Sequence, residues 1–363
     1  MLAAAGGNPL RQAAGANPSD VNLDGVKSGA PIRWPKPIGS PVLDTLRPVI
    51  ENPRDVHTHV DKIVEVAGWM AYEALPMPEY HVPAGVGVND PNETIDFIMV
   101  ADVIDTAFTD FTTHVKFTTE YAGQHWSDSE AEFACLKRAM DNGIPILDGN
   151  FLAKVTRQQL NEIFSGNIEM PMLDEKLQVL HQIGSVLADR YNRRFHNFIK
   201  SCPPLLYDNG RGLVERMAKE FPRFNDVSPY DGHEIKFYKL AQLGLWFAWA
   251  TYPKNGPVQL NDVEKMTTFP DYIVPVALRL LGINSYSSDL EQAIDSYQLI
   301  PRDSTQEVEI RAHSIYATAL LREEINKVRP ADLQVIIPQV NERLWTHYHT
   351  TFWPHHLTET IMY

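Results

Sequence analysis

The sequence predicts a mainly α-helical protein, and three observations lead to this fold class. Helix-start signals recur along the chain from about Val49 onward. Apolar side chains in this part repeat at spacings of three and four residues, which is the period of an amphipathic helix. Long stretches in which apolar and polar residues alternate, as they do in strands, do not occur in the sequence. We therefore expect a helical body.

The first clear helix is expected over residues 127–142. Ser127 and Glu130 have the spacing of a capping box, and Gly143 follows as a stop signal. Cys135 falls within the apolar pattern of this helix. We therefore interpret Cys135 as a small core residue rather than a nucleophile.

Further helices follow along the chain. Thr156 and Gln159 repeat the start signal, and Ser304 with Glu307 opens a later, longer helix. Two other segments carry apolar stripes at helical spacing, namely residues 177–187 and residues 240–247. The second of these stripes is apolar on nearly every side, which predicts a central, buried helix.

The chain is expected to form one domain preceded by an arm. Residues 1–40 are rich in Ala, Gly, Asn, Pro and Ser and have neither a helical nor a strand period. They also lack the apolar core and cleavage site of a secretory signal. We interpret residues 1–48 as a flexible arm that is disordered or loosely docked. Residues 49–363 contain no convincing linker and no fixed-period repeat, so we expect a single domain there.

Composition excludes several classes of protein. Of the 363 residues 44% are hydrophobic and 21% charged, and no apolar run approaches the roughly 20 residues that span a bilayer. The formal charge of −14 opposes binding of extended nucleic acid. Two cysteines are too few for a disulfide framework, which favours a reducing, cytoplasmic compartment. The 13 histidines show no HExxH or CxxC spacing, so we expect neither a metal nor a cofactor.

Three positions have the residue types that chemistry requires, and each also has a purely structural interpretation. Asp102 and Asp105 would share a face if helical, where paired carboxylates act as acid or base or form a solvated helix edge. Asp271 stands between two prolines ahead of an apolar run and could simply cap a helix. Lys239 lies at the start of the buried stripe, where a lysine reaches toward water or serves a site.

Five separated motifs occur from residue 52 onward, at 52–56 (NPRDV), 138–146 (RAMDNGIPI), 237–242 (FYKLAQ), 269–275 (FPDYIVP) and 307–311 (EVEIR). In order and spacing they resemble the queuosine salvage protein family, and the resemblance extends from about residue 50 to Tyr363. Members of that family are queuosine 5′-phosphate N-glycosylases. Their all-helical fold is similar to that of helix-hairpin-helix DNA glycosylases, so the resemblance implies that fold here.

The resemblance also implies roles for individual residues. Asp271 corresponds to the catalytic carboxylate of the family, and Lys239 corresponds to the motif lysine. The expected substrate-binding residues are Asp102, Asp105, Phe108, Tyr238, Tyr272, Glu309 and Arg311. Two of these keep structural alternatives. Arg311 has the i, i+4 spacing to pair with Glu307, and the alternative interpretation of Tyr272 is a core tyrosine.

One segment departs from the family pattern. Where the family has a stretch like Thr-Asp-Thr-Leu-Asn-Phe-Ser-Phe-Trp in its base pocket, this chain has residues 101–109. Asp102 and Phe108 are kept, whereas Asp105, Thr106 and Thr109 replace an asparagine and two aromatic residues. Fewer rings are then available to stack on a base, while Asp105 and Glu130 add hydrogen-bond acceptors.

The resemblance implies hydrolysis of the N-glycosidic bond of queuosine 5′-phosphate or a related modified nucleotide. Such a reaction builds positive charge on the ribose, which an anionic Asp271 would stabilise. Lys239 would orient that carboxylate or hold the 5′-phosphate rather than form a Schiff base. The alternatives are an N-ribosidase for a different base and a catalytically silent nucleotide-binding relative. The expected partner is a small nucleotide or nucleoside, and the protein is expected to be a monomer.

Overall fold

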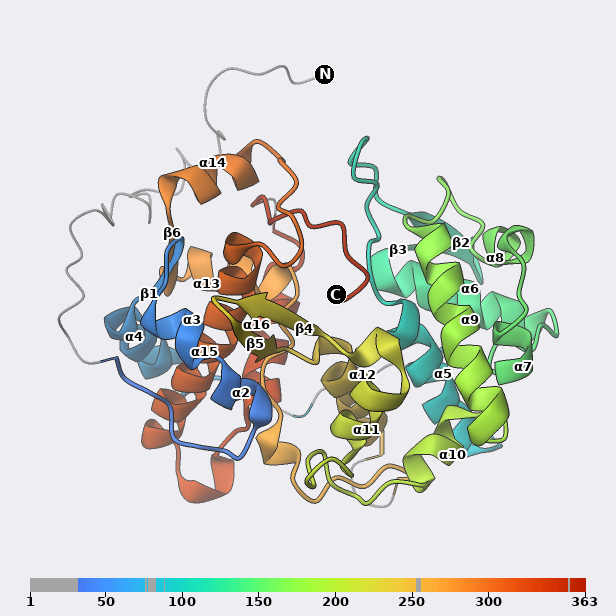
Figure 1. The fold of residues 1–363 in the computed structure, drawn as a ribbon, viewed down its shortest axis with the longest axis horizontal. Helices are drawn as coiled ribbons and strands as arrows, with labels where there is room; N and C mark the ends of the chain where they lie inside the picture. The colour runs from blue at the N-terminus through green and yellow to red at the C-terminus, as the bar shows by residue number, and fades with distance from the viewer. Residues whose placement is uncertain (1–31, 76, 78–82, 88, 253–255, 352) are drawn as a thin grey trace. The chain divides into compact units, whose positions relative to one another are not determined.

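The computed structural model describes residues 32–75, 77, 83–87, 89–252, 256–351 and 353–363 (Figure 1). The described chain is mainly α-helical, as the sequence predicts, with three small two-stranded sheets. It divides into two compact units. Unit 1 takes its described residues from Met1–Pro76, Val227–Phe237 and Met266–Glu359, and unit 2 from Met77–Asp226, Tyr238–Lys265 and Thr360–Tyr363. Because each unit combines separated stretches of chain, the sequence contains no linker that marks the division.

Unit 1 is built around one long helix, α15 (Thr305–Val328), which is buried along most of its length. Its other helical elements are α2 (Pro41–Thr45), α3 (Arg47–Glu51), α4 (Val60–Met70), α13 (Ile273–Leu280), α14 (Ser288–Asp295), η5 (Ala331–Leu333) and α16 (Ile337–Tyr348). Helices α3, α4, α13 and α16 pack against α15 (Figure 1). The Oγ of Ser304 accepts from the N–H of Glu307, which confirms the predicted start of this helix.

Two antiparallel strand pairs complete unit 1. Strands β1 (Val56–Thr58) and β6 (Asn284–Tyr286) pair with His57 opposite Ser285. Strands β4 (Val227–Tyr230) and β5 (His233–Lys236) form a hairpin whose turn places Asp231 and Gly232 at positive φ. An Asp-Gly pair tolerates this conformation, which is typical of two-residue hairpin turns.

Part of the segment that we interpret as an arm packs within unit 1. The carbonyl of Arg33 accepts from the hydroxyl of Tyr316 at 2.6 Å, and the ring of Trp34 meets the ring of Tyr316 edge-on. Helix α2 buries Val42, and residue 48 falls inside α3. Residues 1–31 of the arm lie outside the described residues.

Unit 2 is built around α5 (Pro91–Ile104), which is buried from Thr94 to its end. The other helices are α6 (Asp128–Asp141), α7 (Gly149–Leu152), α8 (Arg157–Ile163), α9 (Leu173–Arg190), α10 (Phe195–Lys200), α11 (Leu213–Glu220) and α12 (Lys239–Ala250). Two 3-10 turns, η3 (Pro222–Phe224) and η4 (Val263–Lys265), and a hairpin of β2 (Thr118–Tyr121) and β3 (Gln124–Ser127) complete the unit. Helices α9, α10 and α12 pack against α5 (Figure 1).

One glycine permits the close packing of α12 on α5. A Cβ atom added to Gly244 would lie 2.6 Å from Oδ2 of Asp102 and 3.1 Å from Sδ of Met99. Real Cβ atoms do not approach other atoms so closely. Helix α12 therefore passes directly over the carboxyl group of Asp102 only because residue 244 lacks a side chain.

The predicted helix starts in unit 2 form at the expected positions. Thr156 and Gln159 make both hydrogen bonds of a capping box at the start of α8. Ser127 stands at the N-cap of α6, but its side chain makes no capping hydrogen bond. Cys135 is fully buried, which raises the pKa of its thiol to about 11 and confirms its interpretation as a core residue.

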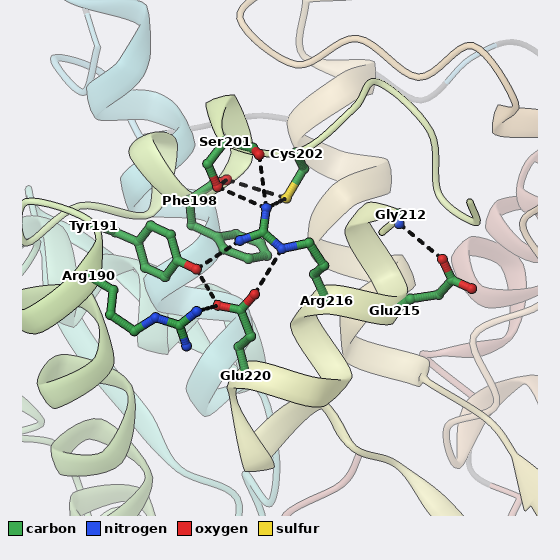
Figure 2. A network of polar contacts seen from close by, with 9 residues as sticks. All are labelled: Arg190, Tyr191, Phe198, Ser201, Cys202, Gly212, Glu215, Arg216 and Glu220. Carbon is green, nitrogen blue, oxygen red and sulfur yellow. Dashed lines mark hydrogen bonds and ion pairs between the residues drawn. The ribbon is translucent and has the colours of Figure 1, made fainter. Parts of the chain in front are cut away.

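Arg216 of α11 joins the ends of α9 and α10 (Figure 2). Its Nε donates to Glu220 at 2.8 Å, and its Nη2 donates to the hydroxyl of Tyr191 at 2.9 Å. Its Nη1 donates to the carbonyl of Ser201 at 2.9 Å and contacts Sγ of Cys202 at 3.2 Å. These charge-assisted hydrogen bonds connect α11 to the C-terminal ends of α9 and α10. Within the described part of the chain, no helix has both the length and the apolar character needed to cross a membrane.

Candidate active site

In unit 2, the segment that follows α5 lies against the start of α12. Helix α5 ends at Ile104, so Asp102 lies in its last turn and Asp105 lies beyond it, with φ −66° and ψ 80°. The ammonium group of Lys239 donates to Oδ2 of Asp105 at 2.7 Å. Only 5% of the Lys239 side chain is exposed, so this is a largely desolvated ion pair.

The backbone before Lys239 is strained. Tyr238 has a left-handed conformation, with φ 48° and ψ 39°. The N–H groups of Tyr238 and Lys239 both donate to Asp226, to its carbonyl at 3.1 Å and to its carboxylate at 3.1 Å. A left-handed residue other than glycine costs of order 1–3 kcal/mol and is found most often at functional sites. Asp226 therefore holds the FYK motif in a conformation that the local sequence does not favour.

Phe108, the aromatic residue kept in the altered segment, is buried beside a lysine. The Nζ of Lys176 lies 5.3 Å from the centroid of the Phe108 ring. The same ammonium donates to the carbonyl of Thr106 and, at 3.3 Å, to that of Ala107. Ala107 has a positive φ of 50°, which turns these carbonyls toward α9.

Three buried charged residues in this region are absent from the predicted site, namely Glu132 of α6, Lys176 of α9 and Arg223 of η3. Their exposed fractions are 0%, 1% and 2%. Sequence signals for two of them exist, because Glu132 shares a helical face with Leu136 and Ala139, and Lys176 shares one with Leu180 and Ile183. A charge on an apolar face is the feature that would have identified them.

Burial shifts the pKa values of four charged groups in this region. It raises those of Asp102 and Glu132 well above the usual range, although the cations of Lys239, Lys176 and Arg223 oppose the shift. Burial also lowers the pKa of Lys176 to about 8 and that of Arg223 to about 10. Exclusion of water thus disfavours the charged form of all four groups.

In the altered segment, Thr106 holds other residues in place instead of presenting a ring that could stack on a base. Thr106 is 3% exposed, and its Oγ1 lies 2.8 Å from the main-chain oxygens of both Thr360 and Tyr363, which share its one hydroxyl hydrogen. Thr106 therefore fastens the C-terminal residues to unit 2. Glu130, expected to add an acceptor, is exposed on α6, whereas Glu132 one half-turn later is buried.

In unit 1, Asp271 stands at the start of α13. Its Oδ1 accepts from the N–H groups of Ile273 at 2.9 Å and Val274 at 3.0 Å. The capping role left open by the sequence is therefore real. It also fixes a carboxylate at a helix N-terminus, where the backbone dipoles stabilise negative charge.

Arg311 of α15 holds the motif that contains Asp271. Its Nε donates to the carbonyl of Pro270 at 3.2 Å, and its guanidinium lies 4.0 Å from the centroid of the Phe237 ring. Its Nη1 is 3.6 Å from Glu307, the pairing that the sequence leaves as an alternative. Arg311 is 1% exposed, so these contacts are desolvated.

Glu309 and Tyr272 have different surroundings from Asp271. The carboxylate of Glu309 accepts from the N–H groups of Arg54, Asp55 and Val56 and from the hydroxyl of Tyr230. It thus ties the first motif, residues 52–56, to the last. Burial raises the pKa of Glu309, although these hydrogen bonds oppose the shift. The ring of Tyr272 lies 4.6 Å from that of His355, at an angle of 33°.

Within the described residues, no cluster of three His, Cys, Asp or Glu side chains suited to a metal occurs. His59 pairs through Nε2 with the hydroxyl of Ser285 at 2.8 Å.

The predicted site residues thus fall into two sets. Asp102, Asp105, Phe108, Tyr238 and Lys239 belong to unit 2, whereas Asp271, Tyr272, Glu309 and Arg311 belong to unit 1. Within unit 2 the structure adds Glu132, Lys176 and Arg223. Chemically, unit 2 offers buried hydrogen-bonding groups of both signs, and unit 1 offers a fixed carboxylate.

Comparisons with known proteins place the chain in a family. The model of the family described as queuosine salvage protein matches residues 86–363. A Sphaerobacter thermophilus protein named queuosine 5′-phosphate N-glycosylase/hydrolase is 32% identical over 329 residues, which cover 89% of this chain and 97% of that protein. Proteins of the same name from Schizosaccharomyces pombe and Bos taurus are 30% and 25% identical, covering 64% and 76% of this chain and 70% and 82% of their own. The chain belongs to the queuosine salvage protein family.

Proposed function

We propose that the protein hydrolyses the N-glycosidic bond of queuosine 5′-phosphate, or of a closely related modified nucleotide, and releases the free base. Water is consumed, and ribose 5-phosphate is the second product. The observation that carries this proposal is the fixed Asp271 carboxylate, in a chain whose relatives bear the name of this activity. The FPDYIVP motif around it is the motif of the family's catalytic carboxylate.

Asp271 acts on the sugar. Breaking the glycosidic bond leaves positive charge on the ribose, and a preorganised anion stabilises that charge without reorganising during the reaction. A 7-deazapurine base lacks the N7 that purine hydrolases protonate. Activation of the leaving base therefore contributes less to the rate of hydrolysis, and the carboxylate contributes more. Arg311 is a positioning residue in this proposal, because it holds the carbonyl of Pro270 next to Asp271.

Lys239 acts as a fixed cation. Its ammonium group is paired with Asp105 at 2.7 Å, and its side chain is almost fully buried. An ammonium group held in an ion pair is not a nucleophile, so a Schiff base is disfavoured. We propose that Lys239, Tyr238, Phe108, Asp102 and Asp105 contact the nucleotide. We also propose Tyr272 as a contact of the nucleoside, whereas Glu309 acts by holding the first motif in place.

The remaining expectations complete this proposal. We propose a helical fold similar to that of helix-hairpin-helix DNA glycosylases, a monomeric state, and activity in the cytoplasm on a small nucleotide without a metal or cofactor. The mainly helical architecture supports the proposed fold. The net charge of −14 supports a small substrate rather than an extended nucleic acid.

The test is base release by the parent protein and by Asp271→Asn. Chromatography of free queuine from queuosine 5′-phosphate, with queuosine and guanosine 5′-phosphate for comparison, measures activity. Asparagine keeps an oxygen for the N–H groups of Ile273 and Val274 but removes the charge, so turnover should fall at least about 1,000-fold with little change in melting temperature.

Asp148→Asn is the matched control. Asp148 also caps a helix, since its side chain accepts from the N–H of Asn150 at 2.8 Å. This variant should keep the parent activity. Parent-like turnover in Asp271→Asn would refute the proposed role of the carboxylate.

A further inference from the structure

The interior of unit 2 contains polar atoms that lack partners. Both carboxyl oxygens of Asp102, both of Glu132 and both Nη atoms of Arg223 are buried and make no hydrogen bond. Buried polar groups nearly always have a partner, so each exception requires an explanation. Here the exceptions lie on α5, α6 and η3 and are concentrated in one region of the unit.

These groups lie within electrostatic reach of one another. The charge of Glu132 interacts with Asp102, Asp105, Lys176 and Arg223. Arg223 in turn interacts with both acids and is anchored through Nε to the carbonyl of Val103 at 2.6 Å. The side chain is thus held by one nitrogen while its two terminal nitrogens are left for another acceptor.

The hydrogen-bonding groups that remain restrict the class of ligand. Asp105 and Lys239 pair with one another at 2.7 Å, and the ammonium of Lys176 donates to backbone carbonyls. The Nη atoms of Arg223 and the carboxyl oxygens of Asp102 and Glu132 are left without partners. A neutral group with one acceptor and adjacent donors would satisfy all three side chains.

We propose that Arg223, Glu132 and Asp102 form a recognition site for the lactam edge of a guanine-like base. The ring carbonyl accepts from the Nη atoms of Arg223, and the adjacent ring N–H and exocyclic amine donate to Glu132, with Asp102 as the neighbouring acceptor. This inference rests on the proposed function, because it assigns residues that select the base of the same substrate. An adenine-like base has a donor where the lactam has its carbonyl and is therefore rejected.

Binding by two donors has a consequence for protonation. A protonated Glu132 has one acceptor oxygen and one O–H, whereas two N–H donors need both oxygens as acceptors. The carboxyl group therefore releases its proton to solvent when the base binds. Burial raises the pKa of Glu132 in the free protein, and the charges of Asp102 and Asp105 add to this shift while those of Lys176 and Arg223 oppose it. This direction of the shift favours the protonated form before the base binds.

Calorimetry with 7-deazaguanine and 7-deazaadenine tests the proposal on the full-length protein. Titrations at pH 7 in two buffers of different ionisation enthalpy measure the protons released. We expect the parent to bind 7-deazaguanine with release of about one proton and at least tenfold more tightly than 7-deazaadenine. The Glu132→Gln variant presents one acceptor and one donor, so its affinity for 7-deazaguanine should fall about 10- to 100-fold and proton release should vanish.

Two further variants keep the test decisive. Glu162→Gln, an exposed glutamate on α8, controls for loss of a carboxylate elsewhere in unit 2 and should bind as the parent does. If Glu132→Gln does not fold, as judged by thermal unfolding, Asp102→Asn replaces it and should also lose base selectivity. Equal binding of the two bases by the parent, or unchanged affinity and proton release in the folded variant, would overturn the proposal.

Turnover separates this inference from the proposed function. Parent activity on queuosine 5′-phosphate with an unchanged KM in Glu132→Gln refutes the recognition site and leaves the hydrolase standing. Selective binding of 7-deazaguanine with proton release, but no base release from any nucleotide, supports the recognition site and refutes the hydrolase.

Discussion

Replacing Gly244 by alanine should disturb the contact between α12 and α5 at the carboxyl group of Asp102. The new Cβ would lie 2.6 Å from Oδ2 and 2.8 Å from Cγ of Asp102, which is only 4% exposed and cannot swing into solvent. Overpacking of this kind costs about 1–3 kcal/mol. Alanine in a helix interior recovers about 0.5–1 kcal/mol relative to glycine. The net loss of unfolding free energy should therefore be about 1–2 kcal/mol.

Urea unfolding followed by circular dichroism measures this loss. Gly68→Ala on α4 is the matched control, since nothing lies within 4 Å of a Cβ at that helix position. It should gain stability by about 0.5–1 kcal/mol. In an Asp102→Ala background the obstructing carboxyl is gone, so Gly244→Ala should cost about 1 kcal/mol less than it does in the parent. Stabilisation of the parent by Gly244→Ala, or equal costs in both backgrounds, would refute the contact.

Two other residues give further predictions. Lys239→Met should lower turnover on queuosine 5′-phosphate at least tenfold, because it removes a buried cation and leaves Asp105 unpaired. Borohydride should trap no adduct in the parent protein. A trapped adduct would establish covalent catalysis instead. Burial lowers the pKa of Lys176 to about 8 from its usual 10.5. Between these two pH values the unfolded chain binds more protons than the folded protein, so the unfolding free energy of the parent rises with pH, by up to about 3 kcal/mol. Lys176→Met lacks this gain, and unfolding free energies of both proteins at pH 7.5 and 9.5 measure it; a pH-independent difference between them would contradict the assignment.

Local signals in the sequence were sufficient for the starts of α8 and α15. The Thr156 and Gln159 capping box forms because its two hydrogen bonds connect residues three apart, and Ser304 caps α15 for the same reason. At Ser127 the position is right, but the cap itself does not form. Asp128 takes a positive φ of 56° as the chain leaves the β3 strand, so the conformation of the preceding hairpin determines the geometry there.

The motifs that identify the family were also visible in the sequence, and so was the carboxylate at Asp271. Its capping of α13 is a contact within three residues, which explains why the sequence predicts it. The contacts of Glu309 with residues 54–56 and of Arg311 with Pro270 are not of this kind. They connect α15 to distant parts of the chain, and such partners are determined by the fold.

The polar interior of unit 2 was decided by tertiary structure alone. Periodicity shows that Glu132 and Lys176 lie on apolar helix faces, but not which groups they meet there. Asp102, Glu132, Lys176 and Arg223 come from four separate elements, and their charge states depend on how much water the assembled unit excludes. Desolvation is a property of the packed unit, whereas a helix cap is a property of a few neighbouring residues.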